Sequence, residues 1–101
     1  MKTILKFGIL LAIVLIMSKC GKNPSADFSY SPQNPKAGQE VQFTNLSEDA
    51  SSYSWNFGDM SIGKEKNPKH VYKNQGSYIV DLTVSSGLKS DTKTVTIVVI
   101  Q

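Results

Sequence analysis

The chain has 101 residues, 40% of them hydrophobic, and eleven basic residues against eight acidic ones give it a formal charge of +3. This length allows one domain and excludes a two-domain enzyme. The single cysteine excludes an internal disulfide framework and a cysteine-based zinc site.

Positive charge is concentrated at the N-terminus. Lys2, Lys6 and Lys19 lie in the first nineteen residues, which contain no acid. From Cys20 onward the remaining eight lysines balance all eight acids. The basic balance of the whole chain therefore does not indicate an anionic partner, and we expect no nucleic acid to bind.

Residues 1–19 are predicted to be a cleavable signal peptide. An apolar run over residues 7–17 follows Lys2 and Lys6 and precedes Cys20, which is the order of a basic, an apolar and a cleavage region. As a helix, this run would span about 16 Å at ~1.5 Å per residue, whereas the hydrocarbon core of a membrane is ~30 Å thick. The run is therefore too short to remain as a transmembrane helix.

The six residues that end at Cys20, LIMSKC, resemble the lipobox of bacterial lipoproteins, with Lys19 where that motif usually has a small residue. The resemblance implies that Cys20 carries acyl chains such as palmitate. They would anchor the mature protein at the cell envelope in a bacterial membrane, with the outer membrane favoured. Residues 20–25, which are small, polar and proline-containing, are then a lipidated tether. The alternative is an ordinary secretory signal with an unmodified thiol.

Residues 26–101 are predicted to form an all-β domain. Large apolar residues alternate with polar ones, as in half-buried antiparallel strands, over residues 28–30, 41–44, 52–57, 78–85 and 94–99. Clusters of Pro, Gly, Asn and Asp separate these runs, as turns do. The pattern predicts an immunoglobulin-like β-sandwich of about seven antiparallel strands with no disulfide.

The core of this sandwich is expected to form around Trp55. Tyr78 lies where immunoglobulin-like domains place a tyrosine that anchors a corner. Val80 lies where those domains place the second disulfide cysteine, so the core depends on packing alone. The other expected core residues are Phe28, Val41, Phe43, Phe57, Leu82, Val84, Val95 and Ile97.

Three linked motifs resemble the polycystic kidney disease (PKD) domain family: WNFGD at 55–59, NPKHVY at 67–72 and GSYIVDLTV at 76–84. The family pattern is W-x-F-G-D-G, P-x-H-x-Y and G-x-Y-x-V-x-L-x-V, and the resemblance covers about residues 26–100. Met60 stands where the family usually has glycine; because a side chain restricts positive φ, this loop is expected to differ in shape. The motif residues, to which the resemblance gives structural roles, are Trp55, Phe57, Gly58, Asp59, Pro68, His70, Tyr72, Gly76 and Tyr78.

The resemblance implies an extracellular, non-catalytic module of the kind found in adhesins, surface-layer proteins and secreted polymer-degrading enzymes. Asp59 and His70 are the residues most like part of a hydrolase triad. The sequence has no G-x-S-x-G turn and no glycine-rich oxyanion loop, and we expect a small sandwich to leave no room for a substrate cleft. Asp59 is instead expected to cap a turn and His70 to hydrogen-bond at the sandwich edge.

Neither an enzyme activity nor a cofactor is therefore predicted. A calcium site is a disfavoured alternative, because the loop acids Glu48, Asp49 and Asp59 lack a metal-binding spacing.

A lysine cluster falls within ten residues and consists of Lys64, Lys66, Lys69 and Lys73. These lysines are expected to protect an exposed edge strand and to keep the domain soluble. Contact with acidic polysaccharide or anionic lipid headgroups is the alternative.

The leading hypothesis is a membrane-anchored lipoprotein with a single PKD domain that mediates protein or carbohydrate binding, as in adhesion, at the cell envelope. Candidate contact residues are Tyr53, Met60 and Ile79. The alternative is a small accessory subunit that docks through a sheet edge onto a larger envelope complex.

Overall fold

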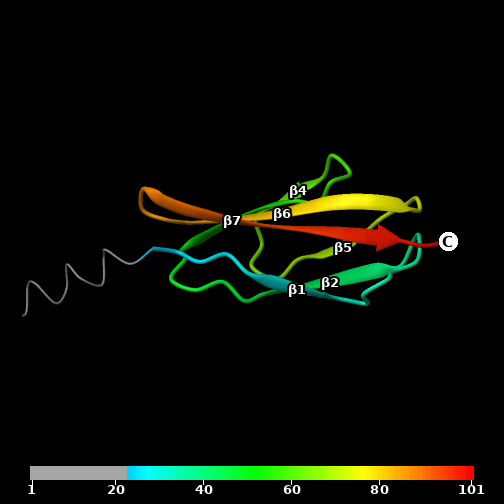
Figure 1. The fold of residues 1–101 in the computed structure, drawn as a ribbon, viewed down its shortest axis with the longest axis horizontal. Helices are drawn as coiled ribbons and strands as arrows, with labels where there is room; N and C mark the ends of the chain where they lie inside the picture. The colour runs from blue at the N-terminus through cyan, green and yellow to red at the C-terminus, as the bar shows by residue number, and fades with distance from the viewer. Residues whose placement is uncertain (1–22) are drawn as a thin grey trace, which may run out of the picture.

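The computed structural model describes residues 23–101 (Figure 1), so the predicted signal peptide, Cys20 and most of the predicted tether lie outside the described residues. No helix in residues 23–101 is long and apolar enough to cross a membrane. The elements are seven β-strands: β1 (Phe28–Ser31), β2 (Glu40–Asn45), β3 (Ser52–Asn56), β4 (Ile62–Gly63), β5 (Lys69–Val71), β6 (Gly76–Ser86) and β7 (Lys89–Val99).

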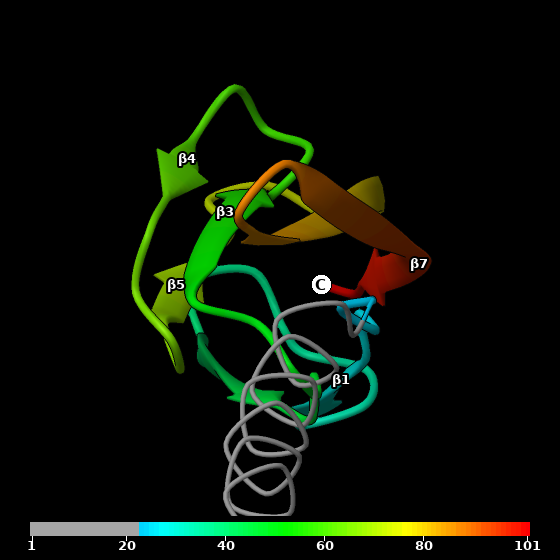
Figure 2. The same ribbon diagram turned by 90° about the vertical axis from the view of Figure 1, so that its left-hand side faces the viewer.

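The strands form two sheets that pack face to face (Figures 1 and 2). One sheet has the order β1-β2-β5 and the other β4-β3-β6-β7, and every pair is antiparallel. This confirms the predicted all-β, immunoglobulin-like sandwich. The edge strands β4 and β5, one from each sheet, lie on the same side of the sandwich (Figure 2).

The strand register directs alternate side chains into the space between the sheets. In the larger sheet Trp55 is opposite Leu82, and Tyr78 is opposite Ile97, so the members of each pair share one face. The buried hydrophobic residues of the described chain are Phe28, Val41, Phe43, Trp55, Phe57, Tyr72, Val80, Leu82, Val84, Ile97 and Val99.

The observed core differs from the predicted one at a few positions. Tyr72, Val80 and Val99 are buried although they were not expected in the core, and Val95 is only partly buried. Val95 faces inward, but β7 is an edge strand, so one side of this residue stays open to solvent. Tyr72 follows β5, a strand too short to show an alternating pattern.

The packed domain begins earlier than residue 26. Pro24 is buried, and Ser25 and Glu48 exchange two backbone hydrogen bonds, of 3.0 and 2.9 Å. The backbone N–H of Ala26 donates to Asp91 Oδ2 at 2.8 Å. The last two residues of the predicted tether therefore belong to the sandwich.

The two ends of the sandwich carry different features. The described chain enters at one end, near the β6–β7 turn, on the left of Figure 1. The β1–β2 connection, the β5–β6 turn and the C-terminus lie at the opposite end (Figure 1). On the side that carries β4 and β5, the β3–β4 loop, β5 and the β5–β6 turn come together, and the candidate site forms among them.

Candidate functional site

Aromatic rings from the three sequence motifs form a continuous row from the core to the surface. Trp55 stacks on Phe57, with ring centroids 6.0 Å apart and planes 5° apart. Phe57 stacks in turn on His70, at 4.2 Å and 7°. The edge of His70 meets Tyr72 at 4.7 Å, and Tyr72 contacts Tyr78 at 4.4 Å. Five motif residues that are far apart in sequence are thus brought into one row.

Hydrogen bonds to backbone carbonyls fix the polar ends of these rings. Trp55 Nε1 donates to the carbonyl of Glu65 at 2.7 Å, and the Tyr72 hydroxyl donates to the carbonyl of Phe57 at 2.8 Å. Burial, with the nearby charge of Asp59, raises the pKa of Tyr72, so this hydroxyl stays protonated and remains a donor. The Tyr78 hydroxyl donates to the carbonyl of Asn74 at 2.7 Å, four residues upstream, as in a tyrosine corner.

Asp59 lies beside His70, the middle ring of this row. Asp59 Oδ2 is 2.7 Å from His70 Nε2, and Asp59 Oδ1 accepts a hydrogen bond of 3.1 Å from the backbone N–H of Ser61. Burial tends to raise the pKa of Asp59, but the hydrogen bonds from His70 and Ser61 and the attraction of the His70 charge outweigh it. The pKa of Asp59 therefore lies below its ordinary value of 3.8.

This lowered pKa predicts how stability depends on pH. A carboxyl group whose pKa is lower in the folded state stabilises the fold above its unfolded pKa, and this contribution is lost as the pH falls through the folded pKa. Asp59→Asn should therefore reduce the free energy of unfolding at pH 7, and the gap from wild type should close as the pH falls from about 5 to about 2. Urea denaturation at a series of pH values measures this gap. Asp49→Asn, in an exposed loop, is the control, and a gap for Asp59→Asn that is constant across this range would contradict the assignment.

Two residues with positive φ, Gly58 and Met60, shape the loop between β3 and β4. Gly58 has a φ of +86°, and a Cβ atom there would lie 2.5 Å from the backbone oxygen of Ile79. Met60, which is fully exposed, has a φ of +74°. Met60 therefore adopts the left-handed conformation that favours glycine, so the side chain at position 60 does not exclude a positive φ.

The strained conformation of Met60 gives a second prediction. A non-glycine residue in the left-handed region costs roughly 1–2 kcal/mol, whereas glycine adds about 0.5–1 kcal/mol of unfolded-state entropy. Because the Met60 side chain has no packing to lose, Met60→Gly should stabilise the domain by about 0.5–1 kcal/mol. Chemical denaturation of the two proteins measures the difference; Met60→Ala retains the strain and should show no such gain. A destabilised Met60→Gly protein would refute this reading of the loop.

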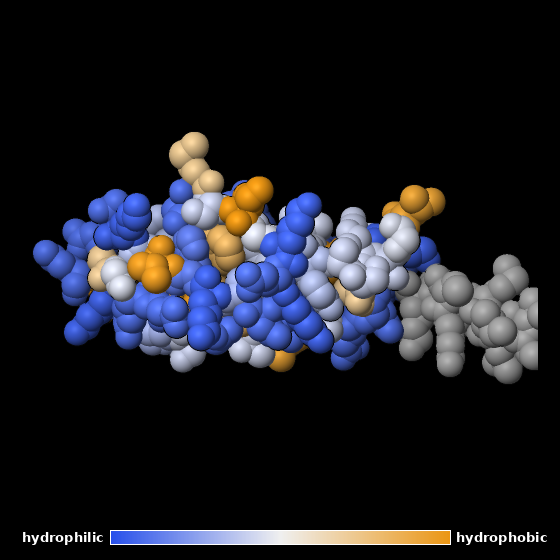
Figure 3. Space-filling model, turned by 180° about the vertical axis from the view of Figure 1, so that it is seen from behind, coloured by the Kyte–Doolittle hydropathy of each residue, from blue (hydrophilic) through white to orange (hydrophobic). Residues whose placement is uncertain are grey.

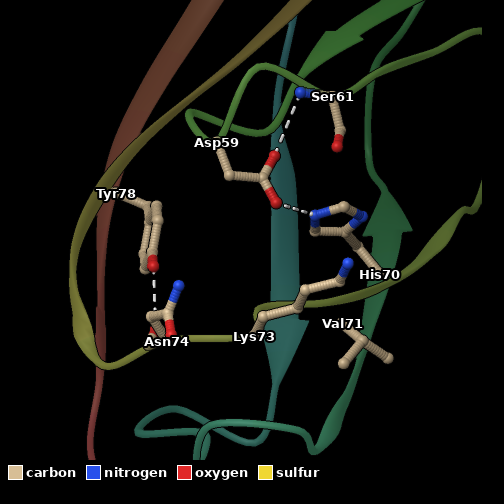
Figure 4. Close-up of a pocket in the computed structure, with 7 residues that line it drawn as sticks. All are labelled: Asp59, Ser61, His70, Val71, Lys73, Asn74 and Tyr78. Atoms are coloured by element: carbon tan, nitrogen blue, oxygen red, sulfur yellow. Dashed lines mark hydrogen bonds and ion pairs between the residues drawn. The ribbon is translucent and has the colours of Figure 1, made fainter.

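A pocket of about 360 Å³ opens beside the Asp59–His70 pair (Figure 4). The expectation that a small sandwich leaves no room for a cleft is therefore wrong, because the β3–β4 loop, β5, the β5–β6 turn and Tyr78 leave a pocket between them. Tyr78 forms one wall, and Lys73 extends across the pocket toward His70 (Figure 4). The residues that line it are Asp59, Ser61, His70, Val71, Lys73, Asn74 and Tyr78.

The pocket contains a serine, a histidine and an aspartate, but they are not arranged as a hydrolase triad. Ser61 contacts Asp59 through its backbone N–H, and no hydrogen bond joins Ser61 to His70 in the described chain. The other loop acids considered for calcium, Glu48 and Asp49, lie between β2 and β3 and do not line this pocket. Among residues 23–101, no three His, Cys, Asp or Glu side chains are grouped as metal ligands.

Sequence reasoning singled out Asp59, His70 and Tyr78, and Lys73 as a member of the lysine cluster, but missed Ser61 and Asn74. Of the candidate contact residues, Met60 and Ile79 are exposed, at 100% and 59%. Tyr53 is instead half-buried against the core, because it lies on the inward-facing side of β3.

The sandwich and its row of motif rings define an immunoglobulin-like module. A family model described as PKD domain matches residues 21–99, and the chain belongs to the PKD domain family.

Solved and curated relatives agree with this assignment. The PKD1 domain from Vibrio cholerae metalloprotease PrtV is 34% identical, with a TM-score of 0.67, over 79% of this chain and 100% of that one. A structure described as the basis for the promiscuous specificity of carbohydrate-binding modules from the β-sandwich superfamily has a TM-score of 0.74 and 34% identity. That similarity covers 79% of this chain and 35% of that one. Collagenase ColA of Bacillus cereus is 48% identical over 42 residues, which are 42% of this chain and 4% of the collagenase.

Proposed function

We propose that this protein is a lipid-anchored, non-catalytic module that binds an extracellular polymer, protein or polysaccharide, at the bacterial cell envelope. The observation that carries the binding role is the PKD family match over residues 21–99, which takes in nearly all of the described chain. Its relatives include a collagenase and a structure of carbohydrate-binding modules. One of these names refers to a protein polymer and the other to carbohydrate, so we propose either class as the ligand.

The arrangement of the domain supports a role in binding. The polar pocket lies on an open side of a rigid sandwich, and its walls are positioned by the row of stacked rings behind it. A pocket held by packed rings presents its polar groups in a fixed geometry, which lowers the entropy lost on binding. The Asp59–His70 pair would supply one face of such a contact surface.

Anchoring is proposed from the lipobox-like residues that end at Cys20. Acylation there would hold the N-terminal end of the sandwich at the membrane, because each buried CH₂ contributes ~0.8 kcal/mol and several chains are attached. The β5–β6 turn, which supplies Lys73 and Asn74 to the pocket, lies at the far end from the entry of the described chain, so this part of the pocket would lie away from the anchor (Figure 1).

Retention on insoluble polymers tests the binding role. The full chain should sediment with at least one of a panel of collagen, chitin, cellulose and peptidoglycan, and hydrolysis products should not appear. Free chain in the supernatant with every polymer would refute the proposal. Polymer hydrolysis that disappears in Asp59→Ala or His70→Ala would replace it with an enzymatic function.

Membrane fractionation tests the anchor separately. Cys20→Ala should move the protein from the membrane to the soluble fraction, whereas Cys20→Ala and wild type should melt alike because residue 20 precedes the packed domain. Unchanged membrane retention of Cys20→Ala would contradict lipid attachment at this residue.

An accessory subunit is the second candidate, and one feature of the sheet favours it. Among the described strands, β7 (Lys89–Val99) pairs with β6 alone; Ala26 and residues 35–37 bond only near its two ends, so a partner strand could add along its middle. Pull-down of the tagged protein distinguishes the two roles. A stoichiometric protein partner that displaces polymer would favour the subunit.

A further inference from the structure

The lysines of the described chain are concentrated along one edge. Lys64, Lys66, Lys69 and Lys73, which we call the basic edge, lie on the β4–β5 connection, β5 and the turn after it. Residues 59–74 contain only two acids against these four lysines, whereas the rest of the described chain has three lysines and six acids. Glu40 on the neighbouring strand β2 pairs with Lys69, so this side carries four lysines against three acids, a small excess of positive charge.

The basic edge includes one extended segment, the strand β5. The chain from Lys66 to Lys73 includes the extended strand β5, and at ~3.3 Å per residue it spans up to about 23 Å. Lys69 lies 3.8 Å from Glu40, with both side chains about 60% exposed, and such a surface pair contributes little and leaves the ammonium group accessible. The surrounding surface is mostly hydrophilic, with hydrophobic side chains standing singly (Figure 3), so it offers no apolar docking patch.

The pocket is continuous with this edge, because Lys73 belongs to both. Lys73 extends over the opening, with the Asn74 side chain and the Tyr78 ring opposite (Figure 4). Asp59 accepts hydrogen bonds from Ser61 and His70 at the back of the pocket. This small polar cavity suits a sugar ring that carries a carboxylate and hydroxyl groups. The ammonium group would bind the carboxylate, the amide the hydroxyl groups, and the aromatic ring the face of the sugar.

We propose that the basic edge and its pocket bind an acidic polysaccharide, with one uronate unit in the pocket and its carboxylate on Lys73. This inference rests on the proposed polymer-binding function and specifies its ligand. The four lysines follow one edge of the sandwich, which suits a chain-like polyanion, whereas an anionic membrane would match a broad basic face. Nucleic acid is disfavoured because the chain has no arginine and the basic edge carries no exposed aromatic ring for base stacking.

Affinity electrophoresis of the full chain tests the proposal, with polygalacturonate as the acidic probe and dextran as the neutral one. Polygalacturonate should retard wild type at about 0.02 M NaCl and much less at about 0.3 M, and dextran should not retard it. Lys66→Gln/Lys73→Gln should weaken binding to polygalacturonate about tenfold. The matched control Lys36→Gln/Lys93→Gln, which removes two lysines from outside the edge, should bind within about twofold of wild type.

These measurements distinguish a failure of the acidic-polysaccharide site from a failure of polymer binding in general. Equal retardation by dextran, or an unchanged affinity in Lys66→Gln/Lys73→Gln, would overturn the acidic-polysaccharide site. If the chain still sediments with collagen or chitin in that case, polymer binding stands and only the ligand class is wrong. Binding to phosphatidylglycerol vesicles without binding to polygalacturonate would also overturn it, in favour of a lipid surface. All four substituted lysines are exposed, so thermal melts of the variants should match wild type.

Discussion

Trp55→Ala is expected to unfold the domain. The Trp55 side chain is fully buried, its ring contacts Phe28, Phe43 and Phe57, and its Nε1–H bonds the carbonyl of Glu65 across the β4–β5 connection. Loss of a buried tryptophan costs about 3–5 kcal/mol, which approaches the whole stability of a domain this small. Circular dichroism during urea denaturation measures the loss, because the substitution removes the only tryptophan fluorophore.

Trp55→Phe serves as the control for this prediction. It keeps a ring in the stack but removes the hydrogen bond to Glu65, so it should remain folded with a loss of about 1–3 kcal/mol. A cooperative transition of Trp55→Ala near that of wild type would contradict the assignment of Trp55 to the centre of the core.

Gly58→Ala should be nearly as damaging, although it adds a single methyl group to an exposed loop residue. The added Cβ would lie 2.5 Å from the oxygen and 2.9 Å from the nitrogen of the Ile79 backbone, inside strand β6. These are backbone atoms, so the loop or the strand must shift, and the positive φ of +86° adds roughly 1–2 kcal/mol of strain. We expect a loss of about 3 kcal/mol or more in the free energy of unfolding.

Gly87→Ala measures the backbone strain alone, so its difference from Gly58→Ala gives the steric part of the loss. Gly87 also has a positive φ, of +62°, but nothing lies within 4 Å of an added Cβ there. It should therefore lose only the roughly 1–2 kcal/mol of backbone strain. Equal losses for Gly58→Ala and Gly87→Ala would show that the close approach to Ile79 does not constrain the β3–β4 loop.

The longer strands are predictable from the sequence because one face of each is buried and the other is not. In β6, Val80, Leu82 and Val84 face the core while Asp81 and Thr83 do not, so period-two alternation follows from a sheet with one covered face. The first half of β7 escapes prediction because residues 89–94 are exposed on both faces, which removes the alternation. Strands β4 and β5, of two and three residues, are too short to show a pattern at all.

The candidate site is predictable only in part. The motif spacing draws attention to Asp59 and His70, but their contact depends on the β3–β4 loop and β5 meeting across two different sheets. No local rule predicts such a meeting from sequence. Lys73 and Asn74 belong to no motif pattern, and they join the pocket because the β5–β6 turn brings them opposite Tyr78. Steric preference alone disfavours a positive φ at Met60, and the conformation that Met60 adopts is not predictable from its residue type.

The central claim is that this PKD domain binds its polymer through the side that carries β4, β5 and the Asp59–His70 pocket. Nuclear magnetic resonance titration of the full chain with a soluble fragment of whichever polymer retains it tests this claim most directly. The amide signals of Ser61, His70, Lys73 and Asn74 should shift progressively with added fragment. Shifts confined instead to the outer face of β6 and β7, such as at Thr83 and Thr92, would contradict it.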